Sequence, residues 1–171
     1  MDTITYITPN FAVTGALAPE DFPKIAALGF RAVVSNLPDS EEVGQLTGRD
    51  EAVLAWRSGL AFRHVPAPKH ELFTDPVVEG MADALNVLDA PVLAHCKSGL
   101  RSVVLWAAAS ARSGQVDCVL DALRRAGFDP TGLRDELEGQ AHRKRWLGQA
   151  RALHCGDDAK TGTPASQRAA A

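Results

Sequence analysis

A short apolar run, PVLA at residues 91–94, leads directly into the octapeptide HCKSGLRS at 95–102 and then into the apolar segment VVLWAAA at 103–109. The first run is typical of a buried strand, and the last is typical of a helix buried at the centre of a domain. A strand that passes through so short a loop into a buried helix indicates an α/β protein. In open sheets of this kind ligands bind beyond the carboxyl ends of the strands, which is where this loop is expected.

The loop places Cys96 before the first turn of the helix. Backbone N–H groups at that position have no partner within the helix and lie at the positive end of its dipole, so they stabilise an anion. In such a setting the pKa of a cysteine falls from about 8.5 to about 3.5–7.5, and the thiol becomes a nucleophilic thiolate at neutral pH. The alternative is that Cys96 is a small buried apolar side chain, as cysteines often are. The residues around it favour the nucleophile.

Arg101 supplies the second chemical group of the loop. Its planar guanidinium matches the oxygens of a phosphate, sulfate or thiosulfonate group with paired hydrogen bonds, which a lysine cannot form. Gly99 lets the backbone turn tightly and approach the anion closely. We therefore expect Cys96 and Arg101 to be catalytic. The other loop residues are expected to bind the substrate: Lys97, Ser98, Gly99, Leu100 and Ser102. Ser102 either donates a hydrogen bond to the Cys96 sulfur or caps the helix.

Strand-like and helical segments alternate along the rest of the chain. Strands are expected at 4–7, 11–14, 32–37, 62–65 and 91–95, and helices at 18–29, 50–60, 77–88, 103–109, 116–126 and 133–153. This alternation predicts an α/β fold with a mostly parallel central sheet flanked by helices.

Residues 1–155 are predicted to form a single domain, and residues 156–171, which have no apolar period, a disordered tail. Within the domain we expect Ile25 and Leu28 to face the core and Cys118 to pack on an apolar helix face. Trp146 and Leu147 are expected to anchor the last helix.

Composition limits the classes of function. A chain of 171 residues that is 46% hydrophobic suffices for one buried core, and a net charge of −3 gives no reason to expect nucleic acid as a partner. Neither a basic leader nor a run of about 20 apolar residues is present, so we expect a cytoplasmic protein with no membrane span. The three cysteines, at 96, 118 and 155, match neither a disulfide framework nor a zinc site. We therefore expect no metal and no other cofactor.

Five stretches share their pattern with one known family. They are FAVTG at 11–15, PED at 19–21, IAALGF at 25–30, NLPDSEE at 36–42 and CKSGLRS at 96–102, which is followed by Trp106. Over roughly residues 3–130 the chain resembles the phosphatase-like domain of bacterial β-lactamase-hydrolase-like proteins, which is also described as a sulfurtransferase domain. The resemblance implies a sandwich fold like that of the dual-specificity phosphatases. It matches Cys96 to the family's nucleophile and Arg101 to its anion-binding arginine.

The loop departs from that of tyrosine phosphatases in length. Those enzymes place five residues between cysteine and arginine, whereas four, at 97–100, stand there in this chain. The shorter count looks like that of rhodanese, whose loop carries sulfur as a cysteine persulfide. A tighter cradle around the anion favours the transfer of sulfur.

The supply of a proton gives a second criterion. Cleavage of a phosphate monoester needs a general acid for the leaving oxygen, whereas transfer of sulfane sulfur between thiolates does not. Tyrosine phosphatases carry this acid on a mobile loop before the cysteine strand, and the matching loop here holds His70, Glu71 and Asp75. Asp75 is more simply explained as a helix-start residue, and His70 and Glu71 as solvated loop residues.

Four more residues are candidates for a supporting role. His95 either raises the thiolate character of Cys96 or orients the loop from a buried position. The resemblance places Asp39, Glu41 and Glu42 at the mouth of the site, although acids in a loop are equally explained by solvation.

We therefore predict a cysteine enzyme, most simply a rhodanese-like sulfurtransferase of sulfide or persulfide metabolism, in which Cys96 carries the sulfur. Its substrate would be a small anion such as thiosulfate or a persulfide. The alternative is a phosphatase that acts on a phosphate ester through a phosphocysteine, and the second alternative is a non-catalytic anion-binding module. Some members of the family are fused to a persulfide dioxygenase, so the resemblance implies such an enzyme, or another sulfur acceptor protein, as a partner.

Overall fold

The computed structural model describes residues 3–143. The part of the last predicted helix beyond residue 143, its anchors Trp146 and Leu147, the third cysteine Cys155 and the predicted tail at 156–171 lie outside the described residues.

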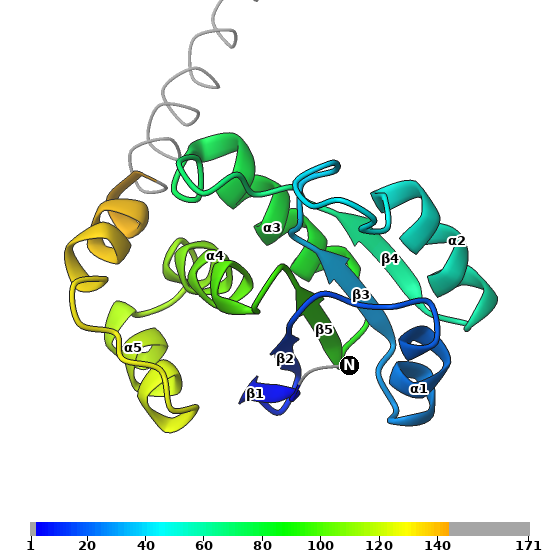
Figure 1. Ribbon diagram of the computed structural model, residues 1–171. Coiled ribbons are helices and arrows are strands. Elements are labelled where there is room, and N and C mark those ends of the chain that lie inside the picture. The colour runs from blue at the N-terminus through cyan, green and yellow to red at the C-terminus, as the bar shows by residue number, and fades with distance from the viewer. Residues whose placement is uncertain (1–2, 144–171) are drawn as a thin grey trace, which may run out of the picture.

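One five-stranded sheet forms the centre of the molecule (Figure 1), with the strand order β1-β2-β5-β3-β4. The strands are β1 (Thr5–Thr8), β2 (Phe11–Thr14), β3 (Ala32–Ser35), β4 (Ala61–His64) and β5 (Val92–His95). β1 pairs antiparallel with β2, and every other neighbouring pair is parallel. The carboxyl ends of β2, β3 and β5 therefore meet at one edge of the sheet.

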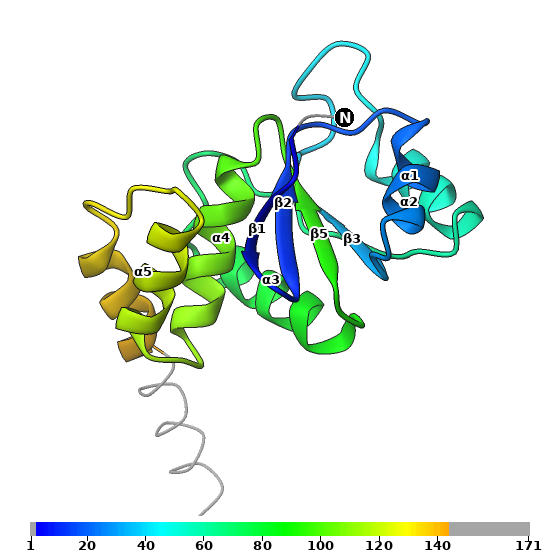
Figure 2. The ribbon, with the colours of Figure 1, turned by 90° about the horizontal axis from the view of Figure 1, so that it is seen from below.

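Helices cover both faces of this sheet, as Figure 2 shows. On one face lie α1 (Asp21–Ala27) and α2 (Gly48–Arg57), and on the other lie α3 (Asp75–Val87), α4 (Leu100–Ala111) and α5 (Val116–Arg125). Residues 134–143 are also helical. The predicted α/β class, a mostly parallel sheet between two layers of helices, is confirmed.

Each central strand sends alternate side chains into two apolar clusters. Val33 and Leu93 pack with Phe22 of α1, whereas Val34 packs in the other cluster with Leu105 of α4. All five of these side chains are buried to 0% exposure. A strand that is covered on both faces needs a continuous run of apolar residues. The strands were predicted from such runs in the sequence.

Two predictions about the core were wrong. Leu28 is 59% exposed, because the buried face of α1 is formed by Asp21, Phe22 and Ile25, and the helix ends at Ala27, so Leu28 at the C-cap lies outside that face. Cys118 is exposed on α5, because the buried stripe of that helix is formed by Val119 and Leu120 with their neighbours one turn further on.

Helix starts also differ from the sequence expectation. α2 begins at Gly48, since Oγ1 of Thr47 accepts a hydrogen bond of 3.2 Å from the Asp50 N–H while Asp50 accepts one from the Thr47 N–H. α4 begins at Leu100, inside the cysteine loop, so Arg101 belongs to its first turn. No helix within residues 3–143 is both long enough and apolar enough to cross a bilayer.

Candidate active site

The cysteine loop runs from the end of β5 to the start of α4 and packs against the end of β2. Gly99 caps α4 with φ at +84°, a left-handed conformation that side-chain-bearing residues rarely adopt. A Cβ at this position would lie 3.1 Å from the carbonyl oxygen of Thr14. Next to it, the Lys97 carbonyl accepts a hydrogen bond of 3.4 Å from the Ala16 N–H. The loop is therefore held in one shape by its backbone.

Cys96 lies at the base of this loop and is only 1% exposed. The first turn of the twelve-residue helix α4 follows it, so the positive end of the helix dipole lies beside the thiol. Ser102 is also fully buried, and its hydroxyl has no hydrogen-bond partner in the described part of the chain. Neither role considered for Ser102 is seen, because Gly99 is the helix cap and no bond to the Cys96 sulfur is formed.

Arg101 is 7% exposed and is bound by a carboxylate from another loop. Its Nη1 donates to Oε2 of Glu41 at 2.8 Å and its Nη2 to Oε1 of Glu41 at 2.5 Å, and Nη1 also donates to the carbonyl of Ala67 at 3.1 Å. A guanidinium has two edges that can each bind an oxyanion bidentately. Glu41 occupies the Nη1–Nη2 edge, and Nε has no partner among residues 3–143, so the Nε–Nη2 edge is the one that can bind substrate.

A second carboxylate of the same loop binds the exposed cation of the site. Glu42 forms an ion pair with Lys97. The hydrogen bond and the charge of Lys97 lower the pKa of the Glu42 carboxyl, and the charge of Lys69 adds to this effect. Asp39 holds the base of the loop, since its Oδ1 accepts a hydrogen bond of 2.7 Å from the Gly48 N–H at the start of α2. The acidic loop at 39–42 thus lies over the cations of the cysteine loop.

His95 and Glu51 form a polar pair that is almost completely buried. Nε2 of His95 lies 3.2 Å from Oε1 of Glu51, and the two side chains are 0% and 3% exposed. The geometry is not that of an aligned hydrogen bond, and Nδ1 of His95 and Oε2 of Glu51 have no hydrogen-bond partner among the described residues. His95 is therefore buried, as expected if it orients the cysteine loop from within the core. Its partner Glu51 was not among the residues expected at the site.

Asn36, at the carboxyl end of β3, connects the cysteine strand to the loop at 66–74. Its N–H donates to the His95 carbonyl at 2.8 Å, its Nδ2 donates to the Val65 carbonyl at 3.0 Å, and its carbonyl accepts from the Ala67 N–H at 3.2 Å. The first residues of this loop are therefore fixed to both β5 and Arg101.

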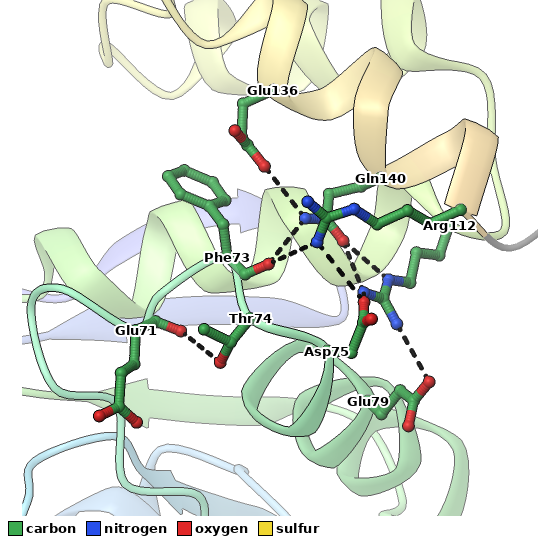
Figure 3. A network of polar contacts seen from close by, with 9 residues as sticks. Glu71, Phe73, Thr74, Asp75, Glu79, Arg112, Glu136 and Gln140 are labelled. Carbon is green, nitrogen blue, oxygen red and sulfur yellow. Dashed lines mark hydrogen bonds and ion pairs between the residues drawn. The ribbon is translucent and has the colours of Figure 1, made fainter.

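The three acid candidates of that loop occupy different surroundings. His70 and Glu71 are 82% and 47% exposed, with Nε2 of His70 3.4 Å from Oε1 of Glu71. Asp75 is the first residue of α3 and is paired with Arg112 (Figure 3). This arrangement agrees with the explanation of Asp75 as a helix-start residue, and it leaves His70 and Glu71 as the titratable candidates.

Sequence reasoning gave no role to two residues of the site: Asn36 and Glu51. Glu51 carried a signal, because it stands four residues before Ala55 on the face of α2 that is buried against the sheet. An acid on a buried face needs a partner, and His95 is that partner. Among residues 3–143 no three His, Cys, Asp or Glu side chains gather in a way that could hold a metal ion.

The fold and the cysteine loop together define the class of cysteine-based, phosphatase-like enzymes. The chain belongs to the family described as "Beta-lactamase hydrolase-like protein, phosphatase-like domain", whose model matches residues 3–113. A beta-lactamase hydrolase-like protein of Xylella fastidiosa is 31% identical over 140 residues, which cover 81% of this chain and 32% of that protein. The chain thus spans about a third of the length of the curated relatives it matches.

Solved structures show the same fold. A candidate phosphatase from Neisseria meningitidis matches with a TM-score of 0.67 and 25% identity, over 80% of this chain and 97% of that one. A second candidate phosphatase, from Shewanella putrefaciens, matches with a TM-score of 0.62 and 18% identity, over 84% of this chain and 94% of that one. The expected likeness to dual-specificity phosphatases is confirmed at the level of the fold.

Proposed function

We propose that the protein is a phosphatase that hydrolyses small phosphate monoesters through a covalent intermediate on Cys96. The observation that carries this proposal is the geometry of Arg101, whose Nη1–Nη2 edge is fixed by Glu41 while its Nε–Nη2 edge is left for a substrate oxyanion. The family description and the phosphatase-like structural neighbours support the same chemistry.

In the first step the Cys96 thiolate attacks phosphorus, a sulfur–phosphorus bond forms and the bond to the ester oxygen breaks. The phosphoryl oxygens are held by Arg101 and by the backbone N–H groups at the start of α4. Donors placed in advance around developing charge usually contribute the largest electrostatic part of catalysis. The leaving alkoxide takes a proton from a general acid, for which the loop at 66–74 offers His70 and Glu71.

In the second step water attacks the phosphocysteine. The sulfur–phosphorus bond breaks, inorganic phosphate leaves and the Cys96 thiolate is restored. The proton lost by the water returns to the group that protonated the leaving oxygen, so the cycle closes without any other reactant.

A second candidate is transfer of sulfane sulfur, and the length of the loop favours it. Only four residues separate Cys96 from Arg101, and Asp75, one of the three candidates for the general acid, is paired with Arg112. In this reaction the Cys96 thiolate attacks the outer sulfur of thiosulfate, sulfite leaves, and an acceptor thiolate then takes the sulfur from the persulfide. No alkoxide has to be protonated, so no general acid is needed.

Parallel assays decide between the two reactions. Wild-type protein is given p-nitrophenyl phosphate and alkyl phosphates in one series, and thiosulfate with a thiol acceptor in the other. The phosphatase proposal predicts turnover of esters that Cys96→Ser abolishes and Arg101→Lys lowers about 10²–10³-fold, since lysine cannot form the fork. The control Cys118→Ser, at an exposed position on α5, keeps full turnover. Turnover of thiosulfate with none of the esters would replace the phosphatase by the sulfurtransferase.

A further inference from the structure

The helix at 134–143 lies beyond the part of the chain that the family model matches, which ends at residue 113. One polar residue of this helix, Gln140, is completely buried at 0% exposure. Figure 3 shows its side chain directed at Arg112 and at the backbone of Phe73. A buried amide is costly unless its polar atoms are paired, so its partners indicate what it does.

Every polar atom of the Gln140 side chain is paired. Its Nε2 donates to the Phe73 carbonyl at 2.9 Å and to Oε1 of Glu136 at 3.1 Å. Its Oε1 accepts from Nε and Nη2 of Arg112 at 2.8 and 2.7 Å. Arg112, just after α4, is itself 8% exposed and also pairs with Asp75. The amide therefore joins three segments: the end of α4, the last helix and the chain that enters α3.

Phe73 is close to the end of the loop that offers the general acid. The other end of this loop is fixed at Ala67, whose carbonyl accepts from Nη1 of the catalytic arginine Arg101 at 3.1 Å. Between these two fixed points stand the exposed residues His70 and Glu71. The loop is thus tied to the active site at its beginning and to Gln140 at its end.

We infer that Gln140 is a positioning residue, which anchors the far end of the loop at 66–74 so that its proton donor is held in place for the leaving group. The inference rests on the proposed phosphatase function. A loop fixed at both ends samples fewer arrangements, and a misplacement of about 1 Å in a catalytic group can cost about 10²-fold in rate. Residues outside the family match would then control the reaction at Cys96.

Gln140→Glu isolates the contribution of the amide N–H donors, because it keeps the volume of the side chain and an acceptor for Arg112. It removes the N–H donors to Phe73 and Glu136, and it brings a second carboxylate beside that of Glu136. Arg143→Ala removes the other donor to the Phe73 carbonyl, at 3.2 Å, from an exposed position. Arg134→Ala is the matched control, since Arg134 lies on the same helix and its ion pairs within residues 3–143 are those with Asp117 and Glu138.

Hydrogen exchange tests the anchor without any assay of activity. In Gln140→Glu, amides at 69–74 should exchange at least tenfold faster than in the wild type and in Arg134→Ala, with β5 and α4 unchanged. Unchanged exchange at 69–74 would overturn the inference. If Gln140→Glu does not fold, Gln140→Met, which removes the amide and keeps an unbranched side chain of similar length, is measured in its place, and unchanged exchange again counts against the anchor. Arg143→Ala keeps the Gln140 bond to Phe73 and should raise exchange less.

The positioning role is tested by the leaving group. Loss of a positioned acid should lower kcat about tenfold or more for an alkyl phosphate and much less for p-nitrophenyl phosphate, with KM little changed, because only the poorer leaving group needs the proton. Equal losses on both esters, or none, would overturn this role. If the wild type hydrolyses neither ester, the proposed phosphatase function is wrong, and so is the role of Gln140 in positioning the proton donor. The exchange measurement still decides whether Gln140 anchors the loop.

Discussion

Glu41 and Arg101 stand 60 residues apart in the sequence and meet through two hydrogen bonds of 2.8 and 2.5 Å. Arg101 is 7% exposed, so this carboxylate is the counter-charge of a nearly buried cation. The pair fixes the plane of the guanidinium and leaves its Nε–Nη2 edge available for another oxyanion. We therefore propose that Glu41 belongs to the active site and is not only a solvated surface residue.

Replacing Glu41 by Gln should lower kcat/KM about 10–10²-fold, because the guanidinium loses its bidentate partner and its orientation. Glu42→Gln is the control, since it acts on the exposed Lys97 and should change kcat/KM by less than about threefold. Steady-state kinetics with the substrate identified by the parallel assays measures both. Equal effects of the two variants would show that Glu41 does not orient Arg101.

Gly99→Ala should disturb the catalytic loop more than an equivalent change elsewhere. Gly99 and Gly127 both have left-handed φ values, +84° and +85°, but only at Gly99 does a Cβ meet another group, the Thr14 carbonyl at 3.1 Å. Gly127→Ala is expected to lower the free energy of unfolding by about 1–2 kcal/mol and to keep activity. Gly99→Ala should cost more stability and most of the activity. Urea denaturation and kinetics of both variants check this, and equal costs would contradict the close approach to Thr14.

The buried pair of His95 and Glu51 should show energetic coupling. A double-mutant cycle with Glu51→Ala and His95→Ala is expected to give a coupling free energy of about 1–3 kcal/mol in urea denaturation, since each change leaves the other polar group buried without its partner. Additive effects of the two changes would mean that the contact at 3.2 Å contributes nothing to stability.

Asp21 should contribute stability that depends on pH. Burial raises the pKa of its carboxyl, while hydrogen bonds from the Ala18 N–H and from Lys24 lower it, and the pKa lies below its usual 3.8. A group with a lowered folded-state pKa stabilises the fold above its unfolded pKa, and that contribution is lost as the pH falls through the folded value. Asp21→Asn should therefore lower the free energy of unfolding by about 1–2 kcal/mol at pH 7, with the difference shrinking below about pH 3.8.

The matched control for Asp21 is Asp121→Asn, which removes an exposed pair with Arg124 at the same spacing of three residues. Its effect should stay within about 0.5 kcal/mol at any pH. Urea denaturation at pH 7 and at pH 2.5–3.5 measures both variants. A wild-type advantage over Asp21→Asn that is as large at the lowest pH as at pH 7 would contradict the assignment.

Local patterns in the sequence predicted the elements of the fold. The run at 91–94 and the cluster of apolar residues after it predicted β5 and α4, and the turn residues at 8–10 predicted the pair of β1 and β2. These predictions are correct because the periods of strands and helices can be read from residues that are close together in the sequence. The prediction for Leu28 was wrong because the apolar period does not show where a short helix ends. That end depends on contacts with the rest of the fold.

Partners far apart in the sequence could not be predicted. Glu41 was placed at the mouth of the site only by family resemblance, and its bond to Arg101 joins two loops whose approach depends on the whole sheet. The contact of Gln140 with Arg112 joins residues 28 apart on two helices. Such pairs arise from packing between elements, and a single sequence does not show them.

The central claim is that Cys96 is the nucleophile and carries the transferred group. Intact-mass spectrometry of protein quenched during turnover tests this claim directly. With a phosphate ester we expect a mass gain of one phosphoryl group, located on Cys96 by peptide mapping and absent in Cys96→Ser. A gain of one sulfur atom on Cys96 from thiosulfate, with no phosphoryl adduct, would keep the nucleophile but assign the second reaction. Full turnover by Cys96→Ser, with no adduct on the wild type, would contradict the account.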